Sequence, residues 1–247
     1  MRLHFLGTGS GSFRGTRRGP TSALLDTLLL DCGAGATGKL EDLGRFDAVE
    51  GVLISHLHTD HIAGLLDFLL HTIISGRTRP LTIVSPPGLG AILEAVFAAE
   101  STVKRPETVY PFRLIEGGSI EATIGRWTLR SVALDHTVPD LGYLLASDGI
   151  TAFYAGDTRE PSAARSTRAD YVIHEATYPD RLASVAREYG HSTSSEAAET
   201  ARAMGARKLW LNHVAGERPD DERAIAEEAR RVFTDSVVAE DLAAYDL

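Results

Sequence analysis

The chain has 247 residues, a formal net charge of −9 and one cysteine, Cys32. This length suits one large α/β or sandwich domain, so we expect a single domain over residues 1–247. The negative charge argues against a broadly basic nucleic-acid-binding surface. A lone cysteine excludes an internal disulfide and a zinc site built from several cysteines.

The sequence also bears on where the protein acts. The first residues lack the long apolar region of a secretory signal, and no apolar run reaches the roughly 18 residues needed to cross a bilayer. Together with the single cysteine, these features predict a cytoplasmic protein without a membrane partner. A local basic cluster near the start is either a solvated loop or a contact for a substrate phosphate, and it consists of Arg14, Arg17 and Arg18.

Short β-like runs occur along the whole chain. They predict strands at residues 2–6, 22–30, 51–54, 81–84, 109–115, 120–124, 127–134, 143–146, 151–154, 171–174 and 208–211. Apolar spacing predicts helices at residues 37–43, 61–74, 89–100, 194–204 and 220–232. In the fourth helix we expect Ser194 as the N-cap and Gly205 as the C-cap. Strands that cluster, with single helices between some of them, predict two packed sheets with helices outside, an αββα sandwich.

Three of the nine histidines lie within the seven residues Ser55–His61, which read SHLHTDH and follow an apolar run. Alternate side chains of an extended segment share one side, so His56, His58 and Asp60 can project together. Imidazole and carboxylate are ligands that zinc prefers, and four such groups can serve two ions about 3.5–4 Å apart. The stretch therefore predicts part of a metal site rather than a histidine-rich surface loop.

Further candidate ligands follow three later strands. A first-row metal ion needs more ligands than one turn of the chain can supply, so further ligands are expected later in the sequence. His136, Asp157 and His213 each stand where a predicted strand ends. The sequence therefore predicts that these residues complete the site that the histidine cluster begins.

With these residues in order, the sequence resembles the metallo-β-lactamase superfamily. The family's ligand motifs match seven positions, namely His56, His58, Asp60, His61, His136, Asp157 and His213. The resemblance implies an αββα sandwich of two mixed sheets with a dinuclear centre at one edge. By the family's pattern one metal is held by His56, His58 and His136. The other is held by Asp60, His61 and His213, and Asp157 bridges them. Zinc is the expected metal, with manganese and iron as alternatives.

Three further stretches resemble the ribonuclease Z branch of this superfamily. They are LGTGSGSFRGTRRGPTSALL near the start, AGDTR around Asp157, and HEATYPD with the later HSTSSEAA. The resemblance implies that His191 reaches the scissile phosphate and that Glu175 orients the phosphate or a neighbouring residue. Asp60 would share in proton handling while it binds metal. In simpler interpretations, His191 only caps the helix that follows it, and Glu175 is a buried structural acid.

Two departures from ribonuclease Z concern the substrate. The family's arm for transfer RNA lies between the third and fourth motifs, but His136 and Asp157 are only 21 positions apart here. The last motif reads His-Val-Ala-Gly-Glu-Arg, whereas the family continues His-Phe-Ser. With the negative net charge, these changes argue against transfer RNA and favour a small or short nucleotide phosphodiester. The resemblance also suggests a homodimer.

The predicted function is a dinuclear-metal-dependent hydrolase, a phosphodiesterase of the ribonuclease Z-like type. A water shared by two cations would lose its proton near neutral pH and attack the phosphorus, while His191 stabilises the developing charge or protonates the leaving oxygen. Three alternatives stay open. They are hydrolysis of a thioester, lactone or sulfate ester, 3′-processing of transfer RNA, and a non-catalytic metal-binding scaffold.

The remaining histidines and the cysteine are expected to be structural. His4 and His71 lie in apolar contexts typical of packed or surface side chains, and His174 stands beside Glu175 on the opposite face of a strand. Cys32 is expected to be a small buried residue rather than a nucleophile.

Overall fold

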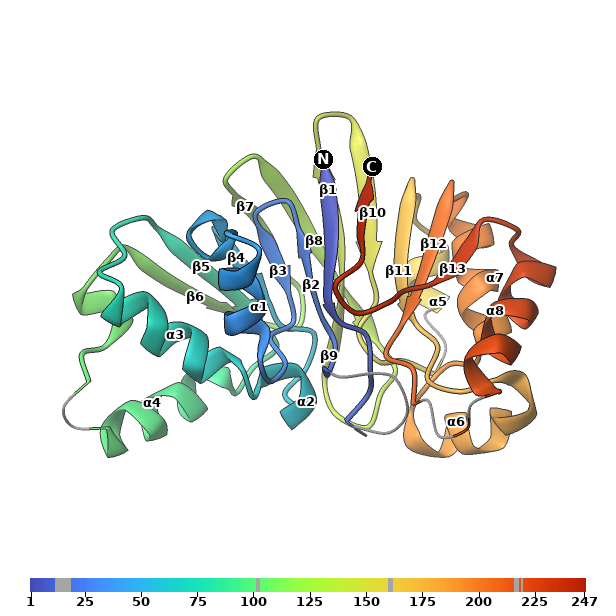
Figure 1. The fold of residues 1–247 in the computed structure, drawn as a ribbon, viewed down its shortest axis with the longest axis horizontal. Coiled ribbons are helices and arrows are strands. Elements are labelled where there is room, and N and C mark those ends of the chain that lie inside the picture. The colour runs from blue at the N-terminus through green and yellow to red at the C-terminus, as the bar shows by residue number, and fades with distance from the viewer. Residues whose placement is uncertain (12–18, 101–102, 160–161, 216–217, 219) are drawn as a thin grey trace.

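The computed structural model describes residues 1–11, 19–100, 103–159, 162–215, 218 and 220–247. Within them, fourteen strands form two seven-stranded sheets that pack face to face, with helices on both outer faces (Figure 1). Both sheets contain parallel and antiparallel pairs. The predicted αββα sandwich of two mixed sheets is confirmed. The basic cluster of Arg14, Arg17 and Arg18 lies outside the described residues.

The first sheet has the order β14-β1-β2-β3-β4-β5-β6. Its strands are β14 (Ala244–Asp246), β1 (Arg2–Gly7), β2 (Ser22–Leu25), β3 (Leu28–Leu30), β4 (Gly51–Leu53), β5 (Leu81–Ser85) and β6 (Phe112–Glu116). Three helices pack on its outer side, α1 (Ala36–Asp42), α3 (Leu65–Ile74) and α4 (Leu89–Ala99). The short helices η1 (Phe46–Ala48) and η2 (Pro106–Thr108) precede β4 and β6.

The second sheet has the order β13-β12-β11-β10-β9-β8-β7. Its strands are β13 (Ser236–Val238), β12 (Lys208–Asn212), β11 (Tyr171–Glu175), β10 (Ile150–Tyr154), β9 (Asp140–Ser147), β8 (Trp127–Leu134) and β7 (Glu121–Ile124). Its outer apolar residues pack against α5 (Ser162–Arg165), α7 (Ser194–Met204) and α8 (Asp221–Val232). Between the sheets lies a core of fully buried large side chains that includes Trp127, Tyr143 and Trp210.

The strand directions create one edge where several chain segments leave the sheets. The pairing makes β1, β3 and β4 run the same way in the first sheet, and β8, β10, β11 and β12 run the same way in the second. Their carboxyl ends come out together at the lower edge of the sandwich (Figure 1). The helix α2 (Thr59–Ile62) lies at this edge, and η3 (Asp180–Leu182) with α6 (Ala183–Tyr189) follows β11.

Some element predictions were wrong in detail. The run at residues 22–30 is a hairpin of β2 and β3, because Asp26 turns the chain with a φ of 55°. The N-cap of α7 is Thr193 rather than Ser194, since Thr193 forms a capping box with Glu196. Gly205 is confirmed as the C-cap, with a φ of 69°.

The helix predicted at residues 61–74 is interrupted, because Gly64 lies against the loop that follows β3. A Cβ on Gly64 would overlap the carbonyl oxygen of Gly33. The Gly64 amide donates to the carbonyl of Cys32 over 2.9 Å, and the Cys32 amide donates to the carbonyl of His61 over 2.8 Å. The loop after β3 is therefore fastened to α2, which carries two of the predicted ligands.

Within the described residues, no helix combines the length and apolar character needed to span a bilayer.

The close approach at Gly64 predicts a large effect of one methyl group. Gly64 has φ −81° and ψ −13°, which alanine also adopts, so Gly64→Ala isolates the steric clash from backbone strain. We expect the free energy of unfolding to fall by about 1–3 kcal/mol, measured by urea titration. The matched control is Gly38→Ala inside α1, where a Cβ meets nothing within 4 Å. That control should gain about 0.5–1 kcal/mol. Equal effects of the two variants would contradict the interpretation.

Candidate metal centre

All seven predicted ligands lie at the edge where the strand ends meet. Their ligand atoms form overlapping groups of three, and the atoms of each group lie within 4.8 Å of one another. The segment after β4 supplies His56 and His58, and α2 supplies Asp60 and His61. The sequence predicted that His56, His58 and Asp60 project together from an extended segment. This prediction is only partly correct, because β4 ends at Leu53 and Asp60 lies in the helix α2.

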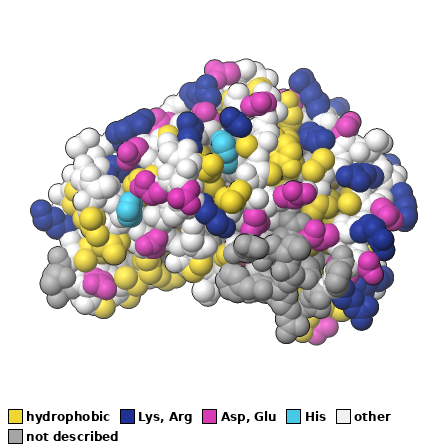
Figure 2. Space-filling model, viewed as in Figure 1, with side chains coloured by type: hydrophobic (Ala, Val, Ile, Leu, Met, Phe, Trp, Pro, Cys, Tyr) yellow, Lys and Arg dark blue, Asp and Glu magenta, His cyan; other side chains and the backbone are white. Residues whose placement is uncertain are grey.

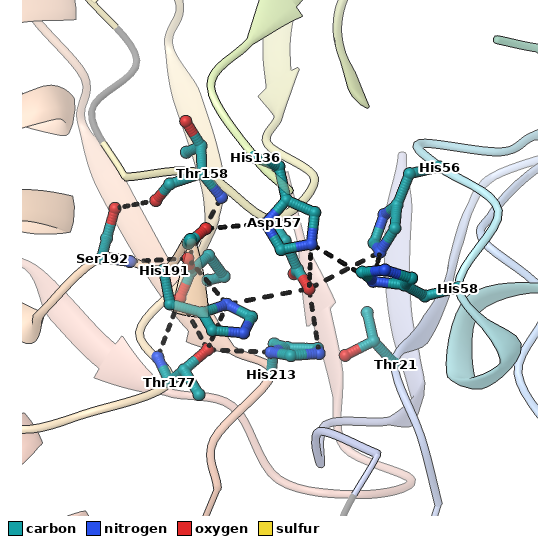
Figure 3. Close-up of polar contacts among 12 residues, drawn as sticks. Thr21, His56, His58, His136, Asp157, Thr158, Thr177, His191, Ser192 and His213 are labelled. Atoms are coloured by element: carbon teal, nitrogen blue, oxygen red, sulfur yellow. Dashed lines mark hydrogen bonds and ion pairs between the residues drawn. The ribbon is translucent and has the colours of Figure 1, made fainter. Parts of the chain in front are cut away.

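The first ligand group consists of three histidines whose nitrogens converge. Nε2 of His56 lies 2.9 Å from Nδ1 of His58, and Nε2 of His136 lies 3.2 Å from the same atom (Figure 3). Burial lowers the pKa of His56 to about 3, and the neighbouring His61 adds to this effect. Burial also lowers the pKa of His58 and that of His136. Three neutral imidazoles that face one point are suited to a divalent cation.

The second ligand group joins α2 to the end of β12. Oδ2 of Asp60 lies 3.3 Å from Nε2 of His213 and 3.7 Å from Nε2 of His61. Nε2 of His61 is buried and has no hydrogen-bond partner among the described residues. A buried nitrogen without a partner is costly, so its position is explained if it is a metal ligand.

Asp157 lies between the two groups, just after β10. Its Oδ2 atom is 3.7 Å from Nε2 of His56 and 4.0 Å from Nε2 of His136. The same oxygen is 3.5 Å from Nε2 of His61 and 3.3 Å from Nε2 of His213. One buried carboxylate oxygen therefore faces both groups, which is the position that a bridging ligand needs.

The charges of the centre favour a cation. Burial lowers the pKa of His61, but the carboxylates of Asp157 and Asp31 outweigh it and raise the pKa well above its usual value. The carboxylates around His61 thus favour positive charge at this position, which a proton or a metal ion can supply. The donor set, the unpartnered nitrogen and the central carboxylate together fit two divalent ions.

Sequence reasoning missed the buried carboxylate of Asp31, which directly follows β3. Its Oδ2 accepts hydrogen bonds from Nδ1 of His61 over 2.7 Å and from the Tyr154 hydroxyl over 2.5 Å. The hydroxyl of Ser55 also donates to Oδ2, and the amide of Ser55 donates to Oδ1 of the same carboxylate, each over 2.7 Å. Such a bond fixes which nitrogen of the histidine faces the metal. The sequence offered only an acid next to a strand, which does not distinguish a buried carboxylate from an exposed one. Asp140, the first residue of β9, is another buried acid that was missed for this reason.

His191 lies beside the ligands (Figure 3), and it forms a pair with Glu175. Nδ1 of His191 lies 3.3 Å from Oε1 of Glu175, 3.2 Å from Oγ1 of Thr177 and 3.8 Å from Oδ2 of Asp157. His191 does not cap α7, because Thr193 does. The capping interpretation of His191 is therefore wrong.

Glu175 organises three loops around this pair. Its Oε1 accepts the backbone N–H of Ser192 over 2.7 Å and that of Thr158 over 3.2 Å. Its Oε2 accepts the hydroxyl of Thr177 over 2.7 Å, and the same hydroxyl oxygen lies 2.9 Å from Nδ1 of His213. Glu175 is thus a buried structural acid that also faces His191. His174, by contrast, is fully buried and bonds the carbonyl of Glu175, as its structural interpretation predicts.

The charge of Glu175 sets the protonation of His191. Burial lowers the pKa of His191, but the Glu175 carboxylate outweighs it and raises the pKa to about 9 in the metal-free protein. Cations in the neighbouring centre would oppose this rise. A raised folded-state pKa means that the pair stabilises the fold fully below about pH 6.5, and that this contribution is lost as the pH rises through about 9.

We therefore predict that Glu175→Gln lowers the pKa of His191 from its wild-type value of about 9 in metal-free protein, because the largest influence that raises this pKa is removed while burial still lowers it and the Asp157 carboxylate still raises it. The measurement is an NMR titration of the His191 ring, with Glu41→Gln on α1 as the control. A His191 pKa that stays near its wild-type value in Glu175→Gln would contradict the assignment of Glu175 as the cause.

Comparison with known proteins agrees with the fold. Residues 26–214 match the family model described as "Beta-lactamase superfamily domain". A ribonuclease Z of Methanosarcina mazei is 28% identical over 299 aligned positions, which cover 98% of this chain and 96% of the relative. The structure of human tRNase Z, short form, superposes with a TM-score of 0.83 at 23% identity, covering 100% of this chain and 99% of that chain. YhfI from Bacillus subtilis, a metallo-β-lactamase fold protein, gives 0.79 at 22% identity, covering 99% and 98%.

Proposed function

The chain belongs to the β-lactamase superfamily, and from this premise we propose that it is a dinuclear-metal-dependent phosphodiesterase acting on a small or flexible phosphodiester. The observation that carries the proposal is the His191–Glu175 pair, whose imidazole lies 3.8 Å from the central carboxylate of Asp157. A metal-binding scaffold would not need a buried acid paired with an imidazole that is not itself among the seven ligands.

The seven ligand residues would hold two divalent cations, for which zinc is the preferred candidate. When bound, two such ions acidify water and neutralise charge on a phosphoryl oxygen. Asp60 suits the role of an anionic ligand: burial raises its pKa, but the hydrogen bond with His213 and the charge of His61 lower it below the usual range. Proton handling by Asp60 is therefore secondary in this proposal.

His191 is proposed as the residue that meets the substrate. Its Nδ1 faces Glu175 and Thr177, and its side chain is 13% exposed, so we assign Nε2 to the contact with substrate. A protonated imidazole there can donate a hydrogen bond to a phosphate oxygen or deliver a proton to the leaving oxygen. Glu175 acts through His191 and is therefore a positioning residue.

The short segment between His136 and Asp157 and the length of the chain support the proposal of a small substrate. The segment from His136 to Asp157 contains only β9, β10 and their hairpin. The alignment with the archaeal ribonuclease Z has 299 positions against 247 residues here, so at least 52 positions lack a counterpart in this chain. On the face shown in Figure 2, Lys and Arg side chains are interspersed with Asp and Glu rather than gathered in one basic surface. These features favour recognition of the reacting group over recognition of a large nucleic acid.

The first test is hydrolysis of bis(p-nitrophenyl) phosphate by zinc- or manganese-loaded protein. We expect turnover of the diester, and a fall in kcat of about 10²–10⁴-fold in His191→Ala, because a proton donor to the reacting group is lost. The variant should keep its two ions, measured by elemental analysis. The matched control is His71→Ala, which removes an outer histidine paired with Glu41.

The same assay separates the competing ester substrates. A thioester, a lactone and an aryl sulfate are offered in parallel to the same metal-loaded protein. Cleavage of one of them with no turnover of the diester would overturn the phosphodiesterase proposal and leave the metal centre intact. Metal binding without turnover of any ester would support the non-catalytic scaffold.

A second candidate is 3′-processing of transfer RNA, which is favoured by the relatives named ribonuclease Z. It is tested with a precursor transfer RNA and an unstructured RNA of the same trailer sequence. On our proposal, KM for the precursor rises less than about tenfold between 50 and 200 mM salt. A protein that contacts six or more phosphates would instead lose about 10³-fold or more in affinity over the same range. The steeper dependence, with a preference for the precursor, would favour the transfer RNA function.

A further inference from the structure

A second buried carboxylate, Asp140, lies behind the first ligand group. It opens β9, and its side chain is fully buried. Oδ2 of Asp140 lies 2.9 Å from Nδ1 of His56 and accepts the backbone N–H of Asp157 over 3.1 Å. One oxygen atom thus holds a ligand that follows β4 and the backbone of the ligand that follows β10. These two strands belong to different sheets.

The hydrogen bond to Asp140 determines which ring nitrogen of His56 carries the lone pair. With Nδ1–H directed at the carboxylate, Nε2 carries the lone pair and faces Nδ1 of His58. The hydroxyl of Ser55 also lies 3.0 Å from Nδ1 of His56, but it donates its proton to Asp31. The carboxyl group of Asp140 is therefore the acceptor for Nδ1–H of His56, as that of Asp31 is for His61.

The contacts of Asp140 do not indicate a residue whose role is to stabilise the fold. Its Oδ1 atom is buried and has no hydrogen-bond partner in the described part of the chain. A Cβ on Gly156 would collide with that oxygen and would lie 2.6 Å from Cβ of Ser55. A buried carboxylate oxygen without a partner destabilises a fold, and such exceptions are found at functional sites.

We propose that Asp140 is a positioning residue for one metal of the pair: it orients His56, which belongs to the first ligand group, so that its loss weakens the ion held by the His56, His58 and His136 group selectively. The inference rests on the proposed dinuclear function and deepens it. It assigns one buried acid to each ligand group: Asp140 to the half of the centre with His56, His58 and His136, and Asp31 to the half with Asp60, His61 and His213.

The test is stepwise binding of Co²⁺ and Zn²⁺ to metal-free protein, in competition with a chromophoric chelator. Asp140→Asn is expected to lower the affinity for one ion about 10–100-fold and to leave the other within about threefold. The matched variant Asp31→Asn should weaken the other ion instead. The Co²⁺ absorption spectrum identifies the half that stays filled, by reference to His58→Ala for the first group and Asp60→Ala for the second.

Thermal unfolding of the metal-free variants separates positioning from a purely structural role. Asp140→Asn keeps one oxygen that can accept from His56 and Asp157 and places an amide nitrogen where the oxygen without a partner was, so its midpoint should stay close to that of the wild type. If this variant does not fold, the smaller Asp140→Ser carries the same test. A lower midpoint with both ions weakened equally, or failure of both variants to fold, overturns the proposal.

The outcomes also separate this inference from the proposed function. If the wild type binds no Co²⁺ or Zn²⁺, both fail. If the wild type binds two ions and Asp140→Asn binds them with unchanged affinities, only the role of Asp140 is overturned. If one ion is lost selectively while the diester is not cleaved by the wild type, the inference stands and the phosphodiesterase proposal falls.

Discussion

A buried negative charge at the meeting point of the strand ends is the constraint on which the rest of the structure depends. Asp157 is 2% exposed, and one of its oxygens lies within 4.0 Å of Nε2 on four histidines. Charge taken out of water must be balanced by opposite charge or by hydrogen bonds. The surrounding imidazoles can supply that balance by taking up a proton or by sharing a cation. Two further buried acids, Asp31 and Asp140, lie behind His61 and His56 and accept hydrogen bonds from them.

The fold meets this requirement by bringing short loops close together. At three glycines a neighbouring group leaves no space for a Cβ atom. Gly64 lies against the backbone of Gly33, Gly156 against the side chain of Asp140, and Gly190 against the ring of His136. Glu175 adds hydrogen bonds to the backbone N–H groups of three loops. Because each loop is fixed at its base by a central strand, the ligand positions follow from the pairing of the sheets rather than from the loops alone.

The sequence allowed much of this to be predicted, for identifiable reasons. The layered fold follows from clusters of short strands, and the histidines of Ser55–His61 have a spacing that a solvated loop does not require. Asp31 and Asp140 could not be predicted, because an acid at a strand end has the same local sequence whether it faces water or a histidine distant in the chain. The capping residue Thr193 was misplaced by one position, since neighbouring Ser and Thr residues are equally good caps. The role of His191 depends on Glu175, and only the fold brings these two together.

The separation of the ligands along the chain has a consequence for folding. Asp60 and His213 are 153 residues apart, and they come from segments attached to different sheets. Ions held between them would act as a cross-link that closes a long loop, and such a link restricts the unfolded chain most when the loop is long. The centre can assemble only after the two sheets have docked. In the proposed dinuclear centre, metal uptake would therefore come late in folding, and chelation would remove this cross-link while the apolar core between the sheets remains.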